Sequence, residues 1–208
     1  DWDKTAKKPE GEVVSVLQAK DEADMAMKEI IIQNGFSLGF PQIVLDEAHS
    51  LNGTIDETEL AGRKDYRDVL TFTIDPADAK DFDDALSIKK LSDNDFEIGV
   101  HIADVSHFVI PETELDKEAY TRATSVYLPD RVNPMLPEKI SNELCSLRPN
   151  EDKYTFSVIF KINNKGKVKE YWVGKTFIHS DHRFTYDEVQ QIIESGDGQY
   201  SEEISLLN

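Results

Sequence analysis

The sequence has little cysteine, comparatively few basic residues and no long apolar run. Cys145 is the only cysteine among 208 residues, which excludes an internal disulfide and a zinc cluster built from thiolates. This cysteine usage fits a reducing compartment. No apolar stretch is long enough to span a bilayer or to serve as a secretory signal. These absences predict a cytoplasmic protein with neither a membrane nor a disulfide partner.

Acidic residues outnumber basic ones. The chain carries 23 Lys and Arg against 41 Asp and Glu, a formal net charge of −18. Such a charge keeps a protein soluble and repels nucleic acid unless metal ions or local basic patches reverse the field. Composition alone therefore argues against an RNA- or DNA-binding protein.

The length and the apolar content predict a folded chain. Hydrophobic residues make up 39% of the sequence and two are tryptophan, which excludes general disorder. A chain of 208 residues can bury a sizeable core, and we expect one main domain with an attached piece. The first residue is Asp, and the final "SEEISLLN" resembles the start of a helix. We therefore expect a fragment of a longer protein.

The first third of the chain is predicted to be mostly helical. Glu12–Leu17 is rich in valine and predicts a short strand. Asp21 is the expected N-cap of a helix that ends at Gly35, and a second helix is expected to follow Pro41. A charged connector, helical in part, leads on to the strands.

Strand patterns dominate from Val69 onward. The predicted elements are strands at Val69–Ile74, 85–91 and Asp95–Val105, a hairpin turning at Gly166, helices at Glu114–Ala123 and Thr185–Ser195, and a proline-rich loop at Tyr127–Ile140. This order predicts an α+β fold with a mixed, largely antiparallel sheet and flanking helices.

The stretch "TIDPADAKDFDDAL" concentrates negative charge between two predicted strands. Only Lys80 offsets its five carboxylates, which belong to Asp75, Asp78, Asp81, Asp83 and Asp84. The spacing of Asp75, Asp81, Asp83 and Asp84 brings carboxylates from two adjacent strand ends to one place. Asp83 and Asp84 cannot both lie in regular strand and share a face, so at least one sits in a turn or has another role.

Hard divalent cations prefer oxygen ligands and high negative charge. Mg²⁺ takes few carboxylates and leaves room for phosphate oxygens, and two such ions about 4 Å apart can clamp a phosphodiester. A solvated acidic loop and a calcium site are the alternatives that spacing leaves open. An EF-hand is excluded because Lys80 occupies the glycine position counted from Asp75.

Three segments, in order, carry a family resemblance. They are "GRKDYRDVLTFTIDPADAKDFDDALSI", "GVHIADVSHFV" and "SVYLPDRVNPMLPEKISNELCSLRPNEDKYTFSV". Together, from about Gly62 to Ile193, they resemble the catalytic RNB domain of the ribonuclease II and ribonuclease R family, and "MLPEKISNELCSL" favours the ribonuclease R type. "PEGEVVSVL" resembles the end of a cold-shock (OB-type) domain. The expected parts are a cold-shock tail at 1–20, a helical connector at 21–61 and the first part of an RNB domain at 62–208.

The resemblance implies a processive, hydrolytic 3′→5′ exoribonuclease that releases nucleoside 5′-monophosphates with Mg²⁺. It implies that Asp75, Asp81, Asp83 and Asp84 hold Mg²⁺ and the scissile phosphate, with Asp83 the most strictly required and Asp75 and Asp84 direct ligands. Asp78 is set apart from these four. It also implies single-stranded RNA as substrate and RNA-decay or ribosome-associated factors as partners.

Tyr127 matches the aromatic residue that stacks on a base near the 3′ end. Core packing is the alternative for an aromatic residue at such a junction. His101, Asp104 and His107 suggest acid–base chemistry, but we interpret the histidines as structural.

The family's later glutamate and arginine have no counterpart before Asn208, so we expect the 208-residue chain alone to be nearly inactive. The competing hypotheses are a catalytically incompetent RNB-like module that binds RNA or a partner, and a calcium-binding interaction site.

Overall fold

The structure is a computed structural model that describes residues 11–13 and 16–208. Within these residues, seven strands form one mixed sheet and two more form a separate ribbon. The strands are β1 (Lys64–Asp65), β2 (Thr71–Asp75), β3 (Asp84–Lys90), β4 (Asp95–Ala103), β5 (Val126–Tyr127), β6 (Val132–Asn133), β7 (Asp152–Asn163), β8 (Val168–His179) and β9 (His182–Thr185). The predicted α+β class with a mixed, largely antiparallel sheet is confirmed.

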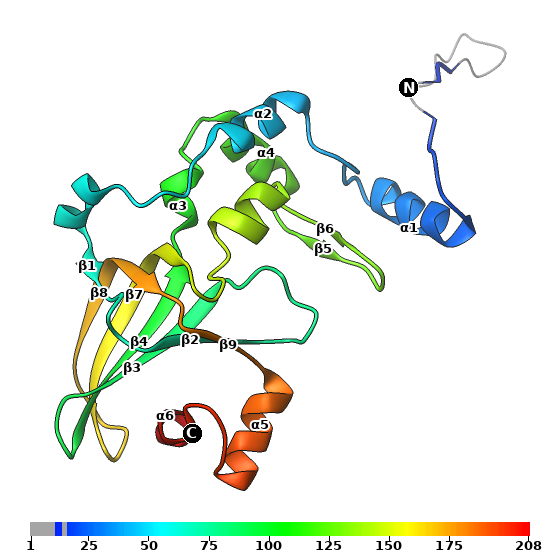
Figure 1. The fold of residues 1–208 in the computed structure, drawn as a ribbon. Helices are drawn as coiled ribbons and strands as arrows, with labels where there is room; N and C mark the ends of the chain where they lie inside the picture. Colours follow the sequence, from blue (N-terminus) through cyan, green and yellow to red (C-terminus); the bar gives the residue numbers. More distant parts are fainter. Residues whose placement is uncertain (1–10, 14–15) are drawn as a thin grey trace.

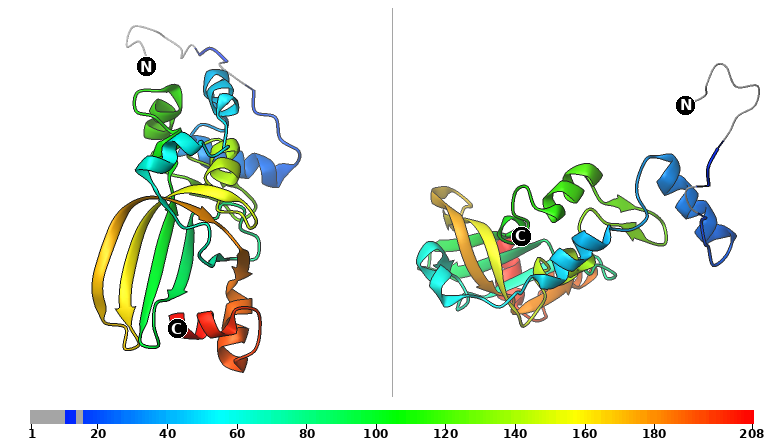
Figure 2. Two further views of the ribbon diagram at one scale, coloured as in Figure 1. Left: turned by 60° about the vertical axis from the view of Figure 1, so that its left-hand side comes forward. Right: turned by 90° about the horizontal axis from the view of Figure 1, so that it is seen from above.

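Helices lie at both ends of this sheet (Figure 1). They are α1 (Glu22–Gln33), α2 (Gln42–Ser50), the 3₁₀ helix η1 (Glu57–Gly62), α3 (Val105–Phe108), α4 (Glu114–Arg122), the π-helix η2 (Lys139–Leu144), α5 (Tyr186–Ser195) and α6 (Ser201–Leu207). The α1 helix stands away from the sheet, whereas α5 and α6 lie beside β2 and β9 (Figure 2). No helix among the described residues is long and apolar enough to cross a membrane.

The sheet is strongly curled. Its order is β1-β8-β7-β4-β3-β2-β9, with parallel pairs only at the two edges. In a flat sheet β8 and β9 would lie five strand spacings apart, roughly 24 Å. The chain from His179 to His182 can span at most about 11 Å. The end of β8 and the start of β9 must therefore approach each other. Asp181, between them, binds the first residue of β2: its N–H donates to Thr71 O (2.7 Å) and its carboxylate accepts from Thr71 N (2.8 Å).

Two apolar clusters stabilise the arrangement by removing apolar surface from water. The larger one packs α2, α4 and η2 against the sheet through fully buried Ala48, Leu115, Ile140 and Phe177. The smaller one packs α5 and α6 on β2 and β9 through Phe72, Phe184, Ile192 and Ile204. The phenyl rings of Phe72 and Phe184 meet edge to face, with centroids 5.4 Å apart.

Local signals predicted the helix ends and one turn correctly. Asp21 accepts a hydrogen bond from Asp24 N at the start of α1, and Gly35 follows its end with a φ of 84°. Thr185 and Glu188 form a capping box on α5. Gly166 has a φ of 70° at the β7–β8 turn, as the hairpin prediction requires.

The prediction of a loop over Tyr127–Ile140 was wrong in part. A short hairpin, β5–β6, lies there, closed by Leu128 N donating to Arg131 O (2.8 Å), and η2 begins at Lys139. Pro129 is compatible with this turn because its fixed φ suits the second position of a β-turn. The predicted strand at Glu12–Leu17 includes positions 14 and 15, which lie outside the described residues, and its described positions are not in a strand. The cold-shock tail stays a prediction.

His101 is a structural histidine. It is fully buried in β4, its Nδ1 lies 2.6 Å from Ser157 Oγ and its Nε2 lies 2.8 Å from Ser87 Oγ. Burial lowers the pKa of the imidazole from 6.5 to about 4. A Cβ at Gly99 would lie 2.4 Å from His101 Nε2, so glycine is required beside it.

The stability of the fold is therefore expected to fall between pH 6.5 and pH 4. Over this range the unfolded chain binds a proton at His101 that the folded chain does not, so acid favours unfolding by about 3 kcal/mol in total. Chemical denaturation at several pH values measures the slope. His101→Gln, whose amide still reaches hydroxyl partners, should lose this part of the slope; an unchanged slope would contradict the assignment.

Candidate active site

The four aspartates singled out in the sequence lie on one strand–loop–strand unit. Asp75 ends β2 and Asp84 begins β3, and these neighbouring strands are antiparallel. Both residues are therefore at the same end of the strand pair. Asp81 and Asp83 lie in the loop that joins the two strands.

The last residue of this loop is held by a backbone hydrogen bond. Ala103 N, at the end of β4, donates to Asp83 O at 2.9 Å. Asp83 precedes β3 whereas Asp84 belongs to it. This arrangement agrees with the expectation that the two neighbouring aspartates do not both lie in regular strand.

The carboxylates act on one another. Asp75 is 8% exposed, and burial, followed by the negative charges of Asp84 and Asp81, raises its pKa. Asp83 is exposed, but partial desolvation by the surrounding loop and the charges of Asp81, Asp84 and Asp75 raise its pKa as well. One buried oxygen, Asp75 Oδ2, has no hydrogen-bond partner among the described residues.

These carboxylates suit a hard cation, because their donor atoms are oxygens and their charge is negative. A cation would satisfy the unpartnered oxygen of Asp75 and relieve the repulsion between the carboxylates. The side chains are not arranged as a closed cage: no group of three or more Asp, Glu, His or Cys in residues 11–13 and 16–208 forms a metal cluster as it stands. Mg²⁺ needs only one or two carboxylates and keeps several waters, so an open set of oxygens suits it better than Ca²⁺.

Tyr127 lies next to the aspartates. It is 69% exposed in the β5–β6 hairpin, which excludes core packing as its role. The negative charge of Asp81, with smaller contributions from desolvation and Asp83, raises the pKa of its phenol. Asp78, in contrast, is an exposed residue in a turn of the loop.

Arg183 is a residue of this site that sequence reasoning did not single out. Its Nη2 donates to Pro76 O at 2.5 Å, its guanidinium lies 5.4 Å from the Phe82 ring centroid, and its charge lowers the pKa of Asp75 in opposition to burial. The parallel pairing of β9 with β2 places it there. No local pattern signals a pairing between segments about 110 residues apart.

Asp104 forms a buried ion pair with Arg63, and the half-buried His107 lies beside the same guanidinium. Arg63 Nη2 lies 2.6 Å from Asp104 Oδ2, and both side chains are almost completely buried. Burial raises the pKa of Asp104, but hydrogen bonds from Ser106 and Arg63 outweigh it and leave the pKa lowered. The His107 ring stacks on Tyr154 at 3.9 Å, and burial lowers its pKa. These contacts support the structural interpretation of the histidine.

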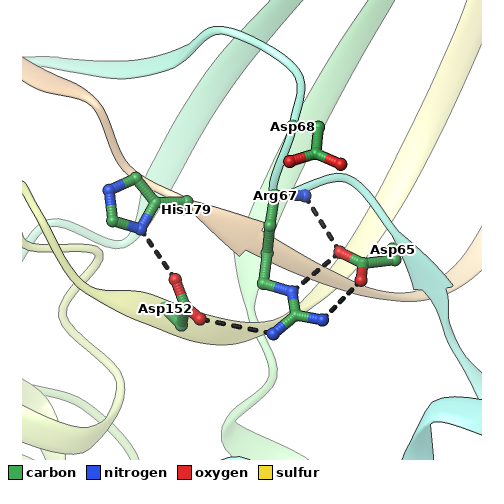
Figure 3. A pocket seen from close by; sticks show the side chains of 5 residues that line it. All are labelled: Asp65, Arg67, Asp68, Asp152 and His179. Atoms are coloured by element: carbon green, nitrogen blue, oxygen red, sulfur yellow. Dashed lines mark hydrogen bonds and ion pairs between the residues drawn. The ribbon is translucent and has the colours of Figure 1, made fainter.

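A separate polar pocket of about 340 Å³ lies before β2, at the end away from Asp75 (Figure 3). Its lining residues are Asp65, Arg67, Asp68, Asp152 and His179. Arg67 pairs with Asp65 and Asp152, and His179 Nδ1 lies 2.7 Å from Asp152 Oδ1. Because all of these side chains except Asp68 contact one another, we interpret this pocket as a structural contact between β1, β7 and β8.

Residues 63–208 match the model of the RNB domain. This chain belongs to the RNB family. The match covers more than half of the chain and includes the β2–β3 loop, the β5–β6 hairpin and β9. The aspartates and Tyr127 therefore lie inside an RNB domain.

The relatives of this RNB chain include ribonuclease R proteins. Ribonuclease R 1 of Lactococcus lactis is 45% identical over 184 residues, which cover 88% of this chain and 22% of the relative. Ribonuclease R of Thermotoga maritima is 43% identical over 190 residues, 90% of this chain and 27% of the relative. The chain thus spans about a quarter of the length of these relatives.

One solved structure shows the same fold with RNA. Mycoplasma genitalium RNase R in complex with ribose methylated single-stranded RNA matches with a TM-score of 0.78 and 33% identity, over 86% of this chain and 28% of that chain. The RNB sheet and helices described above therefore match those of a ribonuclease R.

Proposed function

We propose that the whole protein is a processive, hydrolytic 3′→5′ exoribonuclease. It degrades single-stranded RNA to nucleoside 5′-monophosphates in the cytoplasm and uses Mg²⁺. The observation that carries this proposal is the set of repelling aspartates on the β2–β3 unit, beside the exposed Tyr127, in a chain of the RNB family.

The aspartates would have different roles. Asp75, with one buried oxygen that lacks a hydrogen bond, and Asp84, at the start of β3, are suited to bind the cation directly. Bound Mg²⁺ would neutralise the phosphate and lower the pKa of a water molecule. Asp83 has an exposed side chain on a backbone held by β4, so it could orient the scissile phosphate or that water. The negative charge of Asp81 acts on the carboxyl groups of Asp75 and Asp83 and on the phenol of Tyr127.

Tyr127→Ala is expected to weaken the binding of single-stranded RNA by about 1–3 kcal/mol, because the ring presents a stacking surface for a base. The final RNA product should also change in length. Fluorescence anisotropy without Mg²⁺ measures affinity, and a sequencing gel measures the product. Tyr127→Phe should behave like the wild type, as should Tyr120→Ala, which removes an exposed tyrosine from α4. Equal affinity in all variants would contradict the stacking role.

A second candidate function is RNA or partner binding without catalysis. The observation in its favour is that the aspartates, as they stand in the described residues, do not form a closed metal cluster. In that case the acidic loop would serve as an interaction surface, and Mg²⁺ would have no effect on the fate of the RNA.

One experiment separates the two. The whole protein is mixed with single-stranded RNA labelled at its 5′ end, with Mg²⁺ or with a chelator. A ladder shortening from the 3′ end, seen only with Mg²⁺, supports the exoribonuclease. A stable complex with intact RNA under both conditions supports the binding module and rejects the exoribonuclease.

A further inference from the structure

We propose that Ser146 is a positioning residue for the aspartates: its hydroxyl holds the backbone on both sides of Asp81 and so determines where Asp81 and Asp83 stand. The inference rests on the proposed function and deepens it. It concerns a serine that touches neither substrate nor cation and acts through the β2–β3 loop.

The hydroxyl of Ser146 makes two hydrogen bonds to this loop. Its Oγ donates to Lys80 O at 2.9 Å and accepts from Phe82 N at 3.0 Å. These two backbone groups flank Asp81 in the sequence. Ser146 is fully buried, so water cannot replace the contacts.

Backbone hydrogen bonds continue the restraint to Asp83. Leu147 N donates to Phe82 O at 2.8 Å, and Ala103 N donates to Asp83 O at 2.9 Å. The loop has no strand pairing of its own between Asp75 and Asp84. Residues 146 and 147 therefore supply, from a distant segment, the contacts that a neighbouring strand would supply elsewhere.

Ser146 is itself held firmly. It follows the π-helix η2, whose end is closed by Cys145 N donating to Ile140 O at 2.8 Å. Ile140 and Leu147 are fully buried in the larger apolar cluster. The hydroxyl therefore cannot follow the loop if the loop moves, and a displacement of the loop breaks both of its hydrogen bonds.

The restraint matters because the loop carries like charges. Asp81 lies close enough to Asp75 and Asp83 for its charge to act on both. Without a fixed backbone these carboxylates relieve their repulsion by moving apart, which spreads the oxygens that a cation needs close together. Positioning groups behind metal-binding residues typically contribute about 10- to 100-fold in metal affinity or activity.

The test compares Ser146→Ala with Ser180→Ala in the whole protein. Ser180 is an equally buried serine whose Oγ has no hydrogen-bond partner among the described residues, so its removal deletes a hydroxyl without loosening the loop. Three quantities are measured: the rate of RNA hydrolysis against Mg²⁺ concentration, Mg²⁺ binding by calorimetry without RNA, and amide hydrogen exchange at Phe82. RNA affinity in a chelator serves as a check on the binding surface.

Ser146→Ala is expected to raise the Mg²⁺ concentration for half-maximal hydrolysis and to lower kcat, together by about 10- to 100-fold. It should weaken Mg²⁺ binding, speed exchange at Phe82 and leave RNA affinity unchanged. Ser180→Ala should match the wild type in all of these. Ser146→Cys, which keeps a weaker donor and acceptor, should be intermediate, and it replaces the alanine variant if that variant does not fold.

The inference is overturned if Ser146→Ala has the same hydrolysis, Mg²⁺ binding and Phe82 exchange as the wild type. That result would leave the proposed function unaffected. Absence of hydrolysis by the wild type would instead reject the proposed function. Mg²⁺ binding and Phe82 exchange would then still decide the inference, because neither needs RNA cleavage.

Discussion

Asp83→Asn is expected to abolish RNA hydrolysis by the whole protein while leaving its affinity for RNA nearly unchanged. The substitution keeps the shape of the side chain and removes its negative charge. The backbone bond from Ala103 to Asp83 O is unaffected, so the loop should keep its position. We expect kcat to fall by at least ~10³-fold, as when other groups that act on the transition state are removed.

Asp78→Asn provides the matched control. It makes the same chemical change in the same loop, at an exposed residue outside the proposed set of four. Single-turnover hydrolysis and RNA binding in a chelator are measured for both variants. Substantial activity in Asp83→Asn would contradict the assignment of this site to an exoribonuclease. Equal losses in both variants would show that net charge, rather than the position of Asp83, matters.

Asp104→Ala is expected to lower the free energy of unfolding by about 3–5 kcal/mol. Removing this carboxylate leaves the guanidinium of Arg63, buried beside the rings of Tyr154 and Phe177, with only a longer ion pair of 3.7 Å to the partly exposed Glu59. Lys175 Nζ, 3.3 Å from the same carboxylate, also loses a partner but can turn to solvent because its side chain is partly exposed. Urea denaturation followed by circular dichroism measures the loss.

Asp93→Ala is the control for that measurement. Asp93 pairs with Lys90 on the surface, where both side chains are exposed, so its removal should leave stability unchanged. The double variant Arg63→Met/Asp104→Leu removes both charges together and is expected to recover part of the loss. If Asp104→Ala is as stable as Asp93→Ala, the ion pair is not a stabilising feature of the fold.

Much of the local structure was determined by short stretches of sequence. Asp21, Gly35 and Thr185 mark helix ends because each satisfies, or makes room for, backbone groups within a few residues of itself. Gly166 marks a hairpin for the same reason. The proximity of Asp75 and Asp84 is likewise determined locally. The two residues flank one loop between adjacent strands, so chain connectivity brings them together.

The surroundings of the aspartates depend on the tertiary structure. Arg183 reaches Pro76 only because β9 pairs in parallel with β2, which in turn requires the sheet to curl until the end of β8 lies close to β9. Tyr127 was placed beside Asp81 by a hairpin that the prolines of its segment concealed. Neither contact leaves a periodic trace in the sequence.

The sequence by itself determined which residues are proposed to carry the chemistry: charge and spacing singled out the aspartates, and the family resemblance gave them their proposed roles. Only the tertiary structure decided what holds those residues in place. Ser146 and Ala103 contact the aspartate loop from distant segments, and buried side chains fix their positions. The physical reason is that a hydrogen bond between distant segments depends on the packing of the whole core, whereas a cap or a turn depends on its immediate neighbours.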